Sequence, residues 1–323
     1  MKPIAVAPEL ESTLAARVQA IADDHLSGAS TLTRLAIAVL IDASRFGTMA
    51  VETVACRLCR AQPAMAPLWN AAALAVGEEG DDAVQRLAAQ VDRAPRALAR
   101  VFVDLMLTGR RSSRSEREPL AVATISSSES VRLCLESLAR STSLQVISAE
   151  GRPLLEGRRL AIDLAAAGVA VTVCTDAALS AVVDALSVKL DAIVVGADAV
   201  TPRWFVNKCG TGQLVSSPSV TVSGVPAYVV AGREKFVGPT LAAQLASSGG
   251  PPEEVWDAPP QGVAVANPYF EKVPLEAAAM FVTDVGAIGP GSVPELCQSA
   301  VSTKSTERLA SILREARSGR GDA

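Results

Sequence analysis

The spacing of hydrophobic residues changes near residue 115 of this 323-residue chain. Before that point, apolar residues recur at intervals of three and four, which indicates amphipathic helices. Five stretches follow this pattern: residues 8–26, 31–46, 51–62, 66–76 and 80–107. After it, short apolar runs such as "LAVATIS" and "DAIVVGAD" alternate with helical stretches. The polar, basic stretch "TGRRSSRSEREPL" lies between the two patterns and is expected to be a loop or the end of a linking helix.

Short buried runs separated by helices are typical of a parallel sheet with helices on both faces. The predicted fold class is therefore α/β, with a helical first part and a mostly parallel, doubly wound sheet after it. We expect a helix to begin around Asn207–Thr211, "VAVANPYF" to add a late strand, and one helix to close the chain over residues 293–316. In such sheets ligands bind at the carboxyl ends of the strands, where the strand order reverses.

Composition narrows the class of protein and its partners. With 49% hydrophobic and 20% charged residues, the chain has globular composition, and no apolar run reaches the ~18 residues of a membrane helix. The first residues lack the pattern of a secretory signal, so we expect a cytoplasmic protein without membrane contact. A net charge of −4 and only 3% aromatic residues argue against direct nucleic-acid binding.

The sequence predicts neither a metal nor a cofactor. Six scattered cysteines and a single histidine, His25, do not make a tetrahedral zinc site. Cys56 and Cys59 form a CxxC motif, but their surroundings are helical, which favours two thiols packed in a helix. The chain also lacks the GxxxxGK and GxGxxG patterns of nucleotide-binding loops.

Polar residues follow several of the predicted strands. They are Ser126–Ser128, Glu150 with Arg152, Asp176, Asp198, and Arg233 with Lys235. These side chains would converge at one edge of a parallel sheet. Each is also typical of a turn or a helix cap, as Asp176 is before its helix. The three serines could bind a phosphate at a helix N-terminus or simply cap that helix.

The stretch "VVGADAVTPRWFVNKCGTGQLV" is more specific. Asp198 ends an apolar strand, and Lys208 follows beside Asn207 and a glycine-containing turn. An aspartate can accept a hydroxyl proton, while lysine and asparagine can hold hydroxyls or phosphate. We expect Asp198 and Lys208 to face one cleft. The alternative is a buried structural ion pair between the two.

These motifs resemble those of a known superfamily. "GAD…NKCGTGQL" is similar to the signature shared by methylthioribose-1-phosphate isomerase, ribose-1,5-bisphosphate isomerase and the alpha, beta and delta subunits of translation initiation factor 2B. "SGASTLTRLAI", "SAEGRPLLEGRRLAIDL", "AYVVAGREKF" and "NPYFEKVPLE" resemble further segments of this family. The resemblance implies a helical N-terminal domain over residues 1–115 on a Rossmann-like C-terminal domain, residues 116–323, which binds the ligand and forms a homodimer.

The resemblance also suggests roles for single residues. The isomerases of the family use an aspartate, which corresponds to Asp198, and a cysteine, at whose position this chain has Ser126. They also hold phosphate with an Arg-Gly pair, where this chain has Ser27 and Gly28. The predicted ligand-binding residues are Gly28, Ser126, Ser127, Arg152, Gly196, Asp198, Asn207, Lys208 and Lys235.

Three functions fit this pattern. The leading hypothesis is an initiation factor 2B-like homodimer that binds a phosphorylated metabolite or nucleotide without isomerase activity. The alternative is a divergent aldose–ketose isomerase acting on a ribose phosphate, such as ribose 1,5-bisphosphate or methylthioribose 1-phosphate, with Asp198 as the catalytic residue. Loss of a positioned acid–base partner typically costs ~10²–10⁴-fold in rate, which weighs against it. The third is a structural assembly subunit whose pocket is closed by an ion pair.

Overall fold

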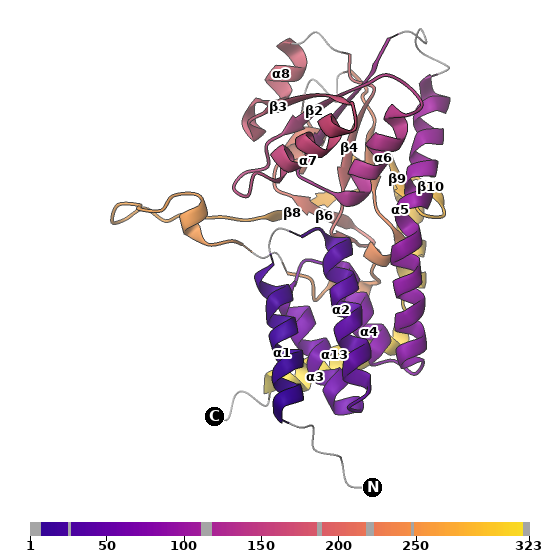
Figure 1. Ribbon diagram of the computed structural model, residues 1–323, viewed down its shortest axis with the longest axis vertical. Coiled ribbons are helices and arrows are strands. Elements are labelled where there is room, and N and C mark those ends of the chain that lie inside the picture. The colour runs from indigo at the N-terminus through magenta and orange to yellow at the C-terminus, as the bar shows by residue number, and fades with distance from the viewer. Residues whose placement is uncertain are drawn as a thin grey trace.

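The computed structural model of the chain describes residues 8–24, 27–110, 118–185, 189–217, 223–246 and 249–318. Helices form its first part, and strands alternate with helices after them (Figure 1). The first helices are α1 (Pro8–Asp23), α2 (Ala29–Ser44), α3 (Thr48–Ala61), α4 (Ala66–Ala75) and α5 (Gly80–Arg110). None of the described helices combines the length and the apolar composition that spanning a membrane needs.

The main sheet has seven strands in the order β10-β9-β7-β4-β1-β2-β3. They are β1 (Leu120–Ile125), β2 (Leu144–Ala149), β3 (Ala170–Cys174), β4 (Ala192–Gly196), β7 (Ala227–Val230), β9 (Met280–Thr283) and β10 (Gly286–Ile288). Strands β1 to β9 of this sheet pair in parallel, and β10 pairs antiparallel with β9 at the edge. The strand order reverses between β1 and β4, which makes this the expected place for a ligand.

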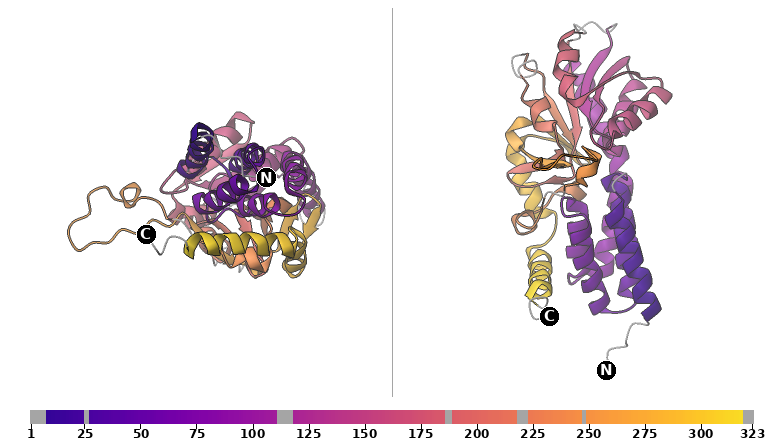
Figure 2. Two further views of the ribbon diagram at one scale, coloured as in Figure 1. Left: turned by 90° about the horizontal axis from the view of Figure 1, so that it is seen from below. Right: turned by 90° about the vertical axis from the view of Figure 1, so that its left-hand side faces the viewer.

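Helices cover both faces of this sheet, as predicted (Figure 2). The later helices are α6 (Glu129–Ala139), α7 (Glu156–Ala166), α8 (Leu179–Ala185), α9 (Thr211–Val215), α11 (Pro239–Ala242), α12 (Val293–Ser299) and α13 (Thr303–Ser318). Side chains alternate across a strand, so Val122 of β1 enters a core with Phe102 of α5, while Ala123 enters a second core with Leu179 of α8. The predicted α/β class, with helices first and a doubly wound sheet after them, is confirmed.

Helix α4 is buried between the other helices and the sheet. Every residue from Ala66 to Ala73 is buried, and the helix contacts α2, α3, α5 and α13. A helix surrounded on all sides has no use for a polar face, which explains the sequence "APLWNAAALA". Asn70 is the one polar side chain within it, and its contacts are described below.

Two helices connect the halves of the chain. α5 packs beside α4 at its start and beside α6 and the sheet further along, where Leu98 and Phe102 join the core of Val122. α13 returns to pack on α3 and α4, and its Leu309 and Leu313 belong to the helical core. The division at residue 115 stays a prediction, and α13 lies with the helical part although it follows that boundary in sequence.

Some predicted elements are wrong in detail. Lys208 does not begin a helix: it ends β6 (Trp204–Lys208), which pairs antiparallel with β5 (Ala199–Val200) and β8 (Phe270–Pro274) in a second, small sheet. The helix that follows is limited to α9. The predicted strand "VAVANPYF" contributes only Phe270 to β8, and the closing helix is two helices, α12 and α13.

Residues 249–268 project from the body of the molecule, as the long orange segment of Figure 1 shows. Hydrogen bonds hold the base of this projection. The Gly250 amide donates to the Asn267 carbonyl at 2.8 Å, and the Tyr269 hydroxyl donates to Glu254 at 2.5 Å. Val255 and Trp256 are exposed on it.

The start of α7 depends on a glycine. A Cβ atom added at Gly157 would lie 1.9 Å from the carbonyl oxygen of Ala149, at the end of β2. Gly157→Ala is therefore expected to lower the free energy of unfolding by about 1–3 kcal/mol or more, because the backbone must move. Denaturant unfolding followed by circular dichroism measures this.

Gly289→Ala is the matched control, since Gly289 has an ordinary φ of −74° and its Cβ would meet nothing within 4 Å. We expect the control to stay within about 0.5 kcal/mol of the parent protein. Equal stability of the two variants would contradict the close packing of α7 on β2.

Candidate functional site

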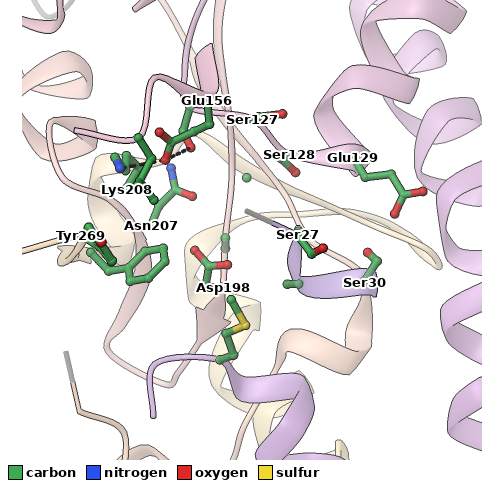
Figure 3. A pocket seen from close by; sticks show the side chains of 18 of the residues that line it. Ser27, Ser30, Ser127, Ser128, Glu129, Glu156, Asp198, Asn207, Lys208 and Tyr269 are labelled. Carbon is green, nitrogen blue, oxygen red and sulfur yellow. Dashed lines mark hydrogen bonds and ion pairs between the residues drawn. The ribbon is translucent and has the colours of Figure 1, made fainter. Parts of the chain in front are cut away.

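A pocket opens at the switch point of the sheet, between β1, β4 and the helical part of the molecule. It encloses about 110 Å³, room for several water-sized groups. Ser126 follows β1, Asp198 follows β4, and Gly28 precedes α2 at the opposite wall. In the view of Figure 3, Asp198 lies between the Lys208–Glu156 pair and the serines at the start of α2.

The structure brings eight of the nine predicted ligand-binding residues to this pocket. They are Gly28, Ser126, Ser127, Gly196, Asp198, Asn207, Lys208 and Lys235. Arg152 is the exception and the prediction for it is wrong: its side chain is exposed and does not line the pocket. The carboxylate of Asp176 accepts hydrogen bonds from the backbone amides of Gly151 and Arg152 at 2.9 and 2.7 Å. These bonds hold the turn in a position that leaves the Arg152 side chain outside the pocket. Arg159 of α7 reaches the pocket instead.

Backbone hydrogen bonds hold Asp198 in place, and its carboxylate faces the pocket. Its amide donates to the Val206 carbonyl at 2.8 Å, and its carbonyl accepts the Ala66 amide of α4 at 3.0 Å. Burial raises the pKa of Asp198 to about 6, against the lowering effect of Lys235 and Lys208. A carboxyl that titrates near neutral pH can exchange a proton with a bound hydroxyl.

Lys208 pairs with a residue that the sequence did not suggest. Its ammonium lies 2.7 Å from Oε1 of Glu156 at the start of α7, and 5.3 Å from the ring centre of Tyr269. Lys208 is only 3% exposed, so this ion pair is shielded from water. The alternative of a closed Asp198–Lys208 ion pair is therefore wrong, while both side chains do line one cleft.

Ser126 has an unusual backbone and a carboxylate beside it. Its φ of 69° lies in the left-handed region, which costs a non-glycine residue on the order of 1–3 kcal/mol. Its hydroxyl donates to Oε1 of Glu156 at 3.4 Å. Strain of this kind is found where the surrounding structure fixes a side chain in a required position.

The other two serines of the triplet differ in their roles. Ser128 caps α6, because its hydroxyl accepts the Val131 amide at 3.4 Å. A Cβ at Gly196 would lie 2.8 Å from this hydroxyl, so the glycine of the GAD motif lets β4 approach the cap. Ser127 lines the pocket. Capping of α6 thus involves one serine and leaves the other two at the pocket wall.

Lys235 is positioned by α4. It ends the short 3-10 turn η2 (Arg233–Lys235) after β7 and is only 4% exposed. The side-chain amide of Asn70 donates to the carbonyls of Glu234 and Phe236, both at 2.8 Å, on either side of Lys235. The same helix therefore holds the loop of Asp198, through Ala66, and the loop of Lys235.

The N-terminus of α2 forms part of the pocket wall. Gly28 is the N-cap, and no side chain caps the helix. Residues 27–30 line the pocket, so the first turn of a 16-residue helix faces it. Helix N-termini attract anions through their amides and the helix dipole.

The residues of the site that were not predicted include Asn70, Glu156 and Tyr269. Asn70 could have been found as the only polar residue in a helix that is otherwise apolar. Glu156 sits between two apolar residues and a glycine in "LLEGRRL", where nothing in the sequence distinguishes it from a helix-start glutamate. Tyr269 belongs to "NPYF", which we read as part of a strand.

The fold and the pocket place the chain among α/β proteins with a polar site at the switch point of a doubly wound sheet. It matches the model of the Initiation factor 2 subunit family over residues 13–290. The chain therefore belongs to this family.

Relatives of the chain include isomerases. A ribose 1,5-bisphosphate isomerase of Archaeoglobus fulgidus is 26% identical over 246 residues, 72% of this chain and 74% of that protein. A methylthioribose-1-phosphate isomerase of Rhodopirellula baltica is 36% identical over 161 residues, 45% of this chain. The matched segment spans only 43% of that second relative.

A solved structure shares the fold. The translation initiation factor eIF-2B of Pyrococcus horikoshii OT3 superimposes with a TM-score of 0.71 at 22% identity, covering 86% of this chain and 97% of that one. The fold, rather than any activity, is what this likeness shows.

The buried carboxylate of Asp198 lowers the stability of the folded protein when it is ionised, so this effect depends on pH. Its folded pKa of about 6 lies above the ordinary 3.8, so the folded state holds the proton more tightly than the unfolded state. The stability that protonated Asp198 contributes to the folded state is fully present below about pH 4 and is lost as the pH rises through 6. Asp198→Asn keeps a neutral side chain and should stabilise the protein by on the order of 3 kcal/mol at pH 8.

Guanidinium unfolding at pH 4 and pH 8 measures this difference. We expect no stabilisation at pH 4. The exposed Asp257 provides the control, since Asp257→Asn should change little at either pH. Destabilisation of Asp198→Asn at pH 8 would show that the ionised carboxylate is held by favourable contacts instead.

Proposed function

We propose that the protein binds a phosphorylated small molecule of the sugar-phosphate class in this pocket. The observation that carries the proposal is Lys235. It is a buried cation that lines the pocket, and its ammonium forms no hydrogen bond or close ion pair with the described residues, although its charge acts on Asp198 at longer range. A buried ammonium needs an anionic partner, and a phosphate at the uncapped start of α2 would provide one.

Polar groups around the remaining wall suit a sugar. Asn207 and Ser127 can hydrogen-bond hydroxyls, and the Glu156 carboxylate can accept them. Relatives named as isomerases of methylthioribose 1-phosphate and of ribose 1,5-bisphosphate support the same ligand class. The proposed protein is initiation factor 2B-like, works in the cytoplasm and binds its ligand without useful isomerase activity. Activity is not expected because Ser126 stands where the family's isomerases have a cysteine, and Ser27 stands where they have an arginine.

The family resemblance also supports a homodimer formed through the C-terminal part. The segment concerned, residues 267–286, includes β8 and β9 and ends at the edge strand β10. Val285, beside β10, is 61% exposed. An exposed apolar side chain at a sheet edge suits burial against a second copy of the chain.

Thermal shift tests the ligand class. Ribose phosphates, methylthioribose 1-phosphate and nucleoside monophosphates should include one that stabilises the protein by roughly 2.7 kcal/mol at 100 times its dissociation constant. Lys235→Met should weaken that binding by about 10- to 100-fold, because it removes the cation but keeps the length of the side chain.

The control for this variant is Lys304→Met. Lys304 is exposed and pairs with Glu78 on the surface, so its loss should leave affinity unchanged. If no phosphorylated compound shifts the unfolding temperature, or if Lys235→Met binds as tightly as the parent, the proposed phosphate contact does not exist.

Isomerase activity is the second candidate, and one contact favours it. The hydroxyl of Ser126 donates to the Glu156 carboxylate, so a base lies beside the serine that replaces the thiol. Asp198, with its pKa of about 6, could supply the other proton transfer of an aldose–ketose shift. We still expect the parent protein to convert neither ribose 1,5-bisphosphate nor methylthioribose 1-phosphate at a useful rate.

Product analysis by NMR tests this expectation. The double variant Ser126→Cys, Ser27→Arg restores the two groups that the isomerases have and is the variant in which activity should appear first. A ketose product from the parent protein that disappears in Asp198→Asn would establish the isomerase instead.

A further inference from the structure

We propose that the protein has a second small-molecule site, which takes an α-amino acid with an apolar side chain. The site is a cavity of about 280 Å³ lined by α4, α5, η2 and α12, against about 110 Å³ for the pocket at the switch point. Ligand pockets for small molecules begin at about 300 Å³, so this volume suits a molecule of amino-acid size. Arg233 and Glu234 of η2 line the cavity, while Lys235 of the same turn lines the other pocket.

Two buried side chains of the cavity lack hydrogen-bond donors. Asn70 is 2% exposed and Glu234 is 4% exposed. Oδ1 of Asn70 and Oε2 of Glu234 have no hydrogen-bond partner among the described residues. The amide nitrogen of Asn70 cannot help, since it already donates to the carbonyls of Glu234 and Phe236. Buried acceptors without donors destabilise a fold, so a ligand that brings N–H groups gains from meeting them.

The fold makes room for the carboxylate of Glu234. A Cβ atom at Gly232 would lie 2.2 Å from Oε2, and the Gln90 side chain hydrogen-bonds to the carboxylate from α5. Burial raises the pKa of Glu234, against the lowering effect of Lys235. An ammonium group in the cavity would favour the ionised carboxylate and would bring three N–H donors. This part of the cavity therefore suits the ammonium group of a ligand.

Two arginines of the cavity suit a carboxylate. Arg233 binds Asp284 through its Nε and its backbone amide, at 3.0 and 2.9 Å, and Arg86 binds Glu79 through one terminal nitrogen. A guanidinium has five N–H donors, so these pairs leave donors on both arginines, and arginine commonly binds a carboxylate through two parallel hydrogen bonds. Because Glu79 and Asp284 already balance the two charges, a ligand that carries both signs fits better than a simple anion.

Apolar side chains complete the wall of the cavity. They are Leu74 of α4, Leu87 of α5, Leu296 of α12 and Val301 after it. Apolar walls with a few polar groups that fix the orientation are typical of small-molecule sites. An α-amino acid with an aliphatic side chain has the ammonium, the carboxylate and the apolar part that these three sets of residues would contact.

Isothermal titration calorimetry at pH 7.5 tests the proposal. The full chain is titrated with L-leucine, with 4-methylpentanoate, which lacks the ammonium group, and with 3-methylbutylamine, which lacks the carboxylate. We expect L-leucine to bind and each analogue to bind at least about tenfold more weakly. Each analogue leaves either Glu234 and Asn70 or the two arginines without their partner.

Two variants assign the contacts. Glu234→Gln should weaken L-leucine by about tenfold or more without weakening 4-methylpentanoate, because that analogue has no ammonium group. Arg86→Met should weaken L-leucine to a similar extent without weakening 3-methylbutylamine. Arg57→Met is the matched control, since Arg57 is exposed on α3 and does not line the cavity, and it should bind L-leucine as the parent does.

The outcomes are distinct from those for the sugar phosphate, which takes no part in this titration. If L-leucine does not bind, or if either analogue binds the parent as tightly, the amino-acid site does not exist. Unchanged L-leucine binding in a folded Glu234→Gln or Arg86→Met variant would also overturn it. Circular dichroism checks the fold of each variant, and should Glu234→Gln not fold, the two analogues and Arg86→Met decide.

Discussion

The hydrogen bonds that α4 makes to two loops are the constraint on which the pocket depends. Ala66 holds the carbonyl of Asp198, and Asn70 holds the carbonyls on either side of Lys235. Each such bond contributes only about 0.5–1.5 kcal/mol, but leaving a buried carbonyl without a donor costs about 1–3 kcal/mol. The loops are therefore held where α4 places them, and the carboxylate and the lysine reach the pocket from a rigid base.

This arrangement joins the helical part of the molecule to the sheet. The sheet supplies Ser126 and Asp198 at its switch point, and the helical part supplies the start of α2 and the whole of α4. Neither part forms the pocket alone. The strained backbone of Ser126 and the raised pKa of Asp198 are costs to the folded state, and they are concentrated at this junction. Such a concentration is typical of a site maintained for binding or chemistry.

The fold could be predicted from the sequence because the spacing of hydrophobic residues is regular within each helix and strand. Strands β1 and β4 are buried along their whole length and almost entirely apolar, and such runs arise when both faces of a sheet are buried. β6 escaped prediction because Trp204–Lys208 is short and follows a turn, and antiparallel pairing with β8 decides its conformation. Residues 263–266 have the alternation of a strand, but they lie in the projection and have no partner strand among the described residues.

Apart from Gly28, which came from the family resemblance, the residues of the site were predictable where they stand at or near a strand end. Asp198 and Ser126 follow directly from that rule. Arg152 also satisfies it, yet the carboxylate of Asp176 binds the backbone of its turn, and its side chain stays outside the pocket. Glu156 and Asn70 contribute through contacts with residues far away in the sequence. Glu156 lies 52 positions from its partner Lys208, and Asn70 lies 164 positions from its partner Glu234. Contacts of this range depend on the tertiary fold and leave no local pattern.

The most direct test of a phosphate-binding pocket is a crystal structure of the protein with the sugar phosphate that binds best. We predict that the phosphate lies within hydrogen-bond distance of Nζ of Lys235 and of the first-turn amides of α2, with the sugar hydroxyls toward Glu156 and Asn207. An empty pocket at saturating ligand, or a phosphate bound away from Lys235, would contradict this account.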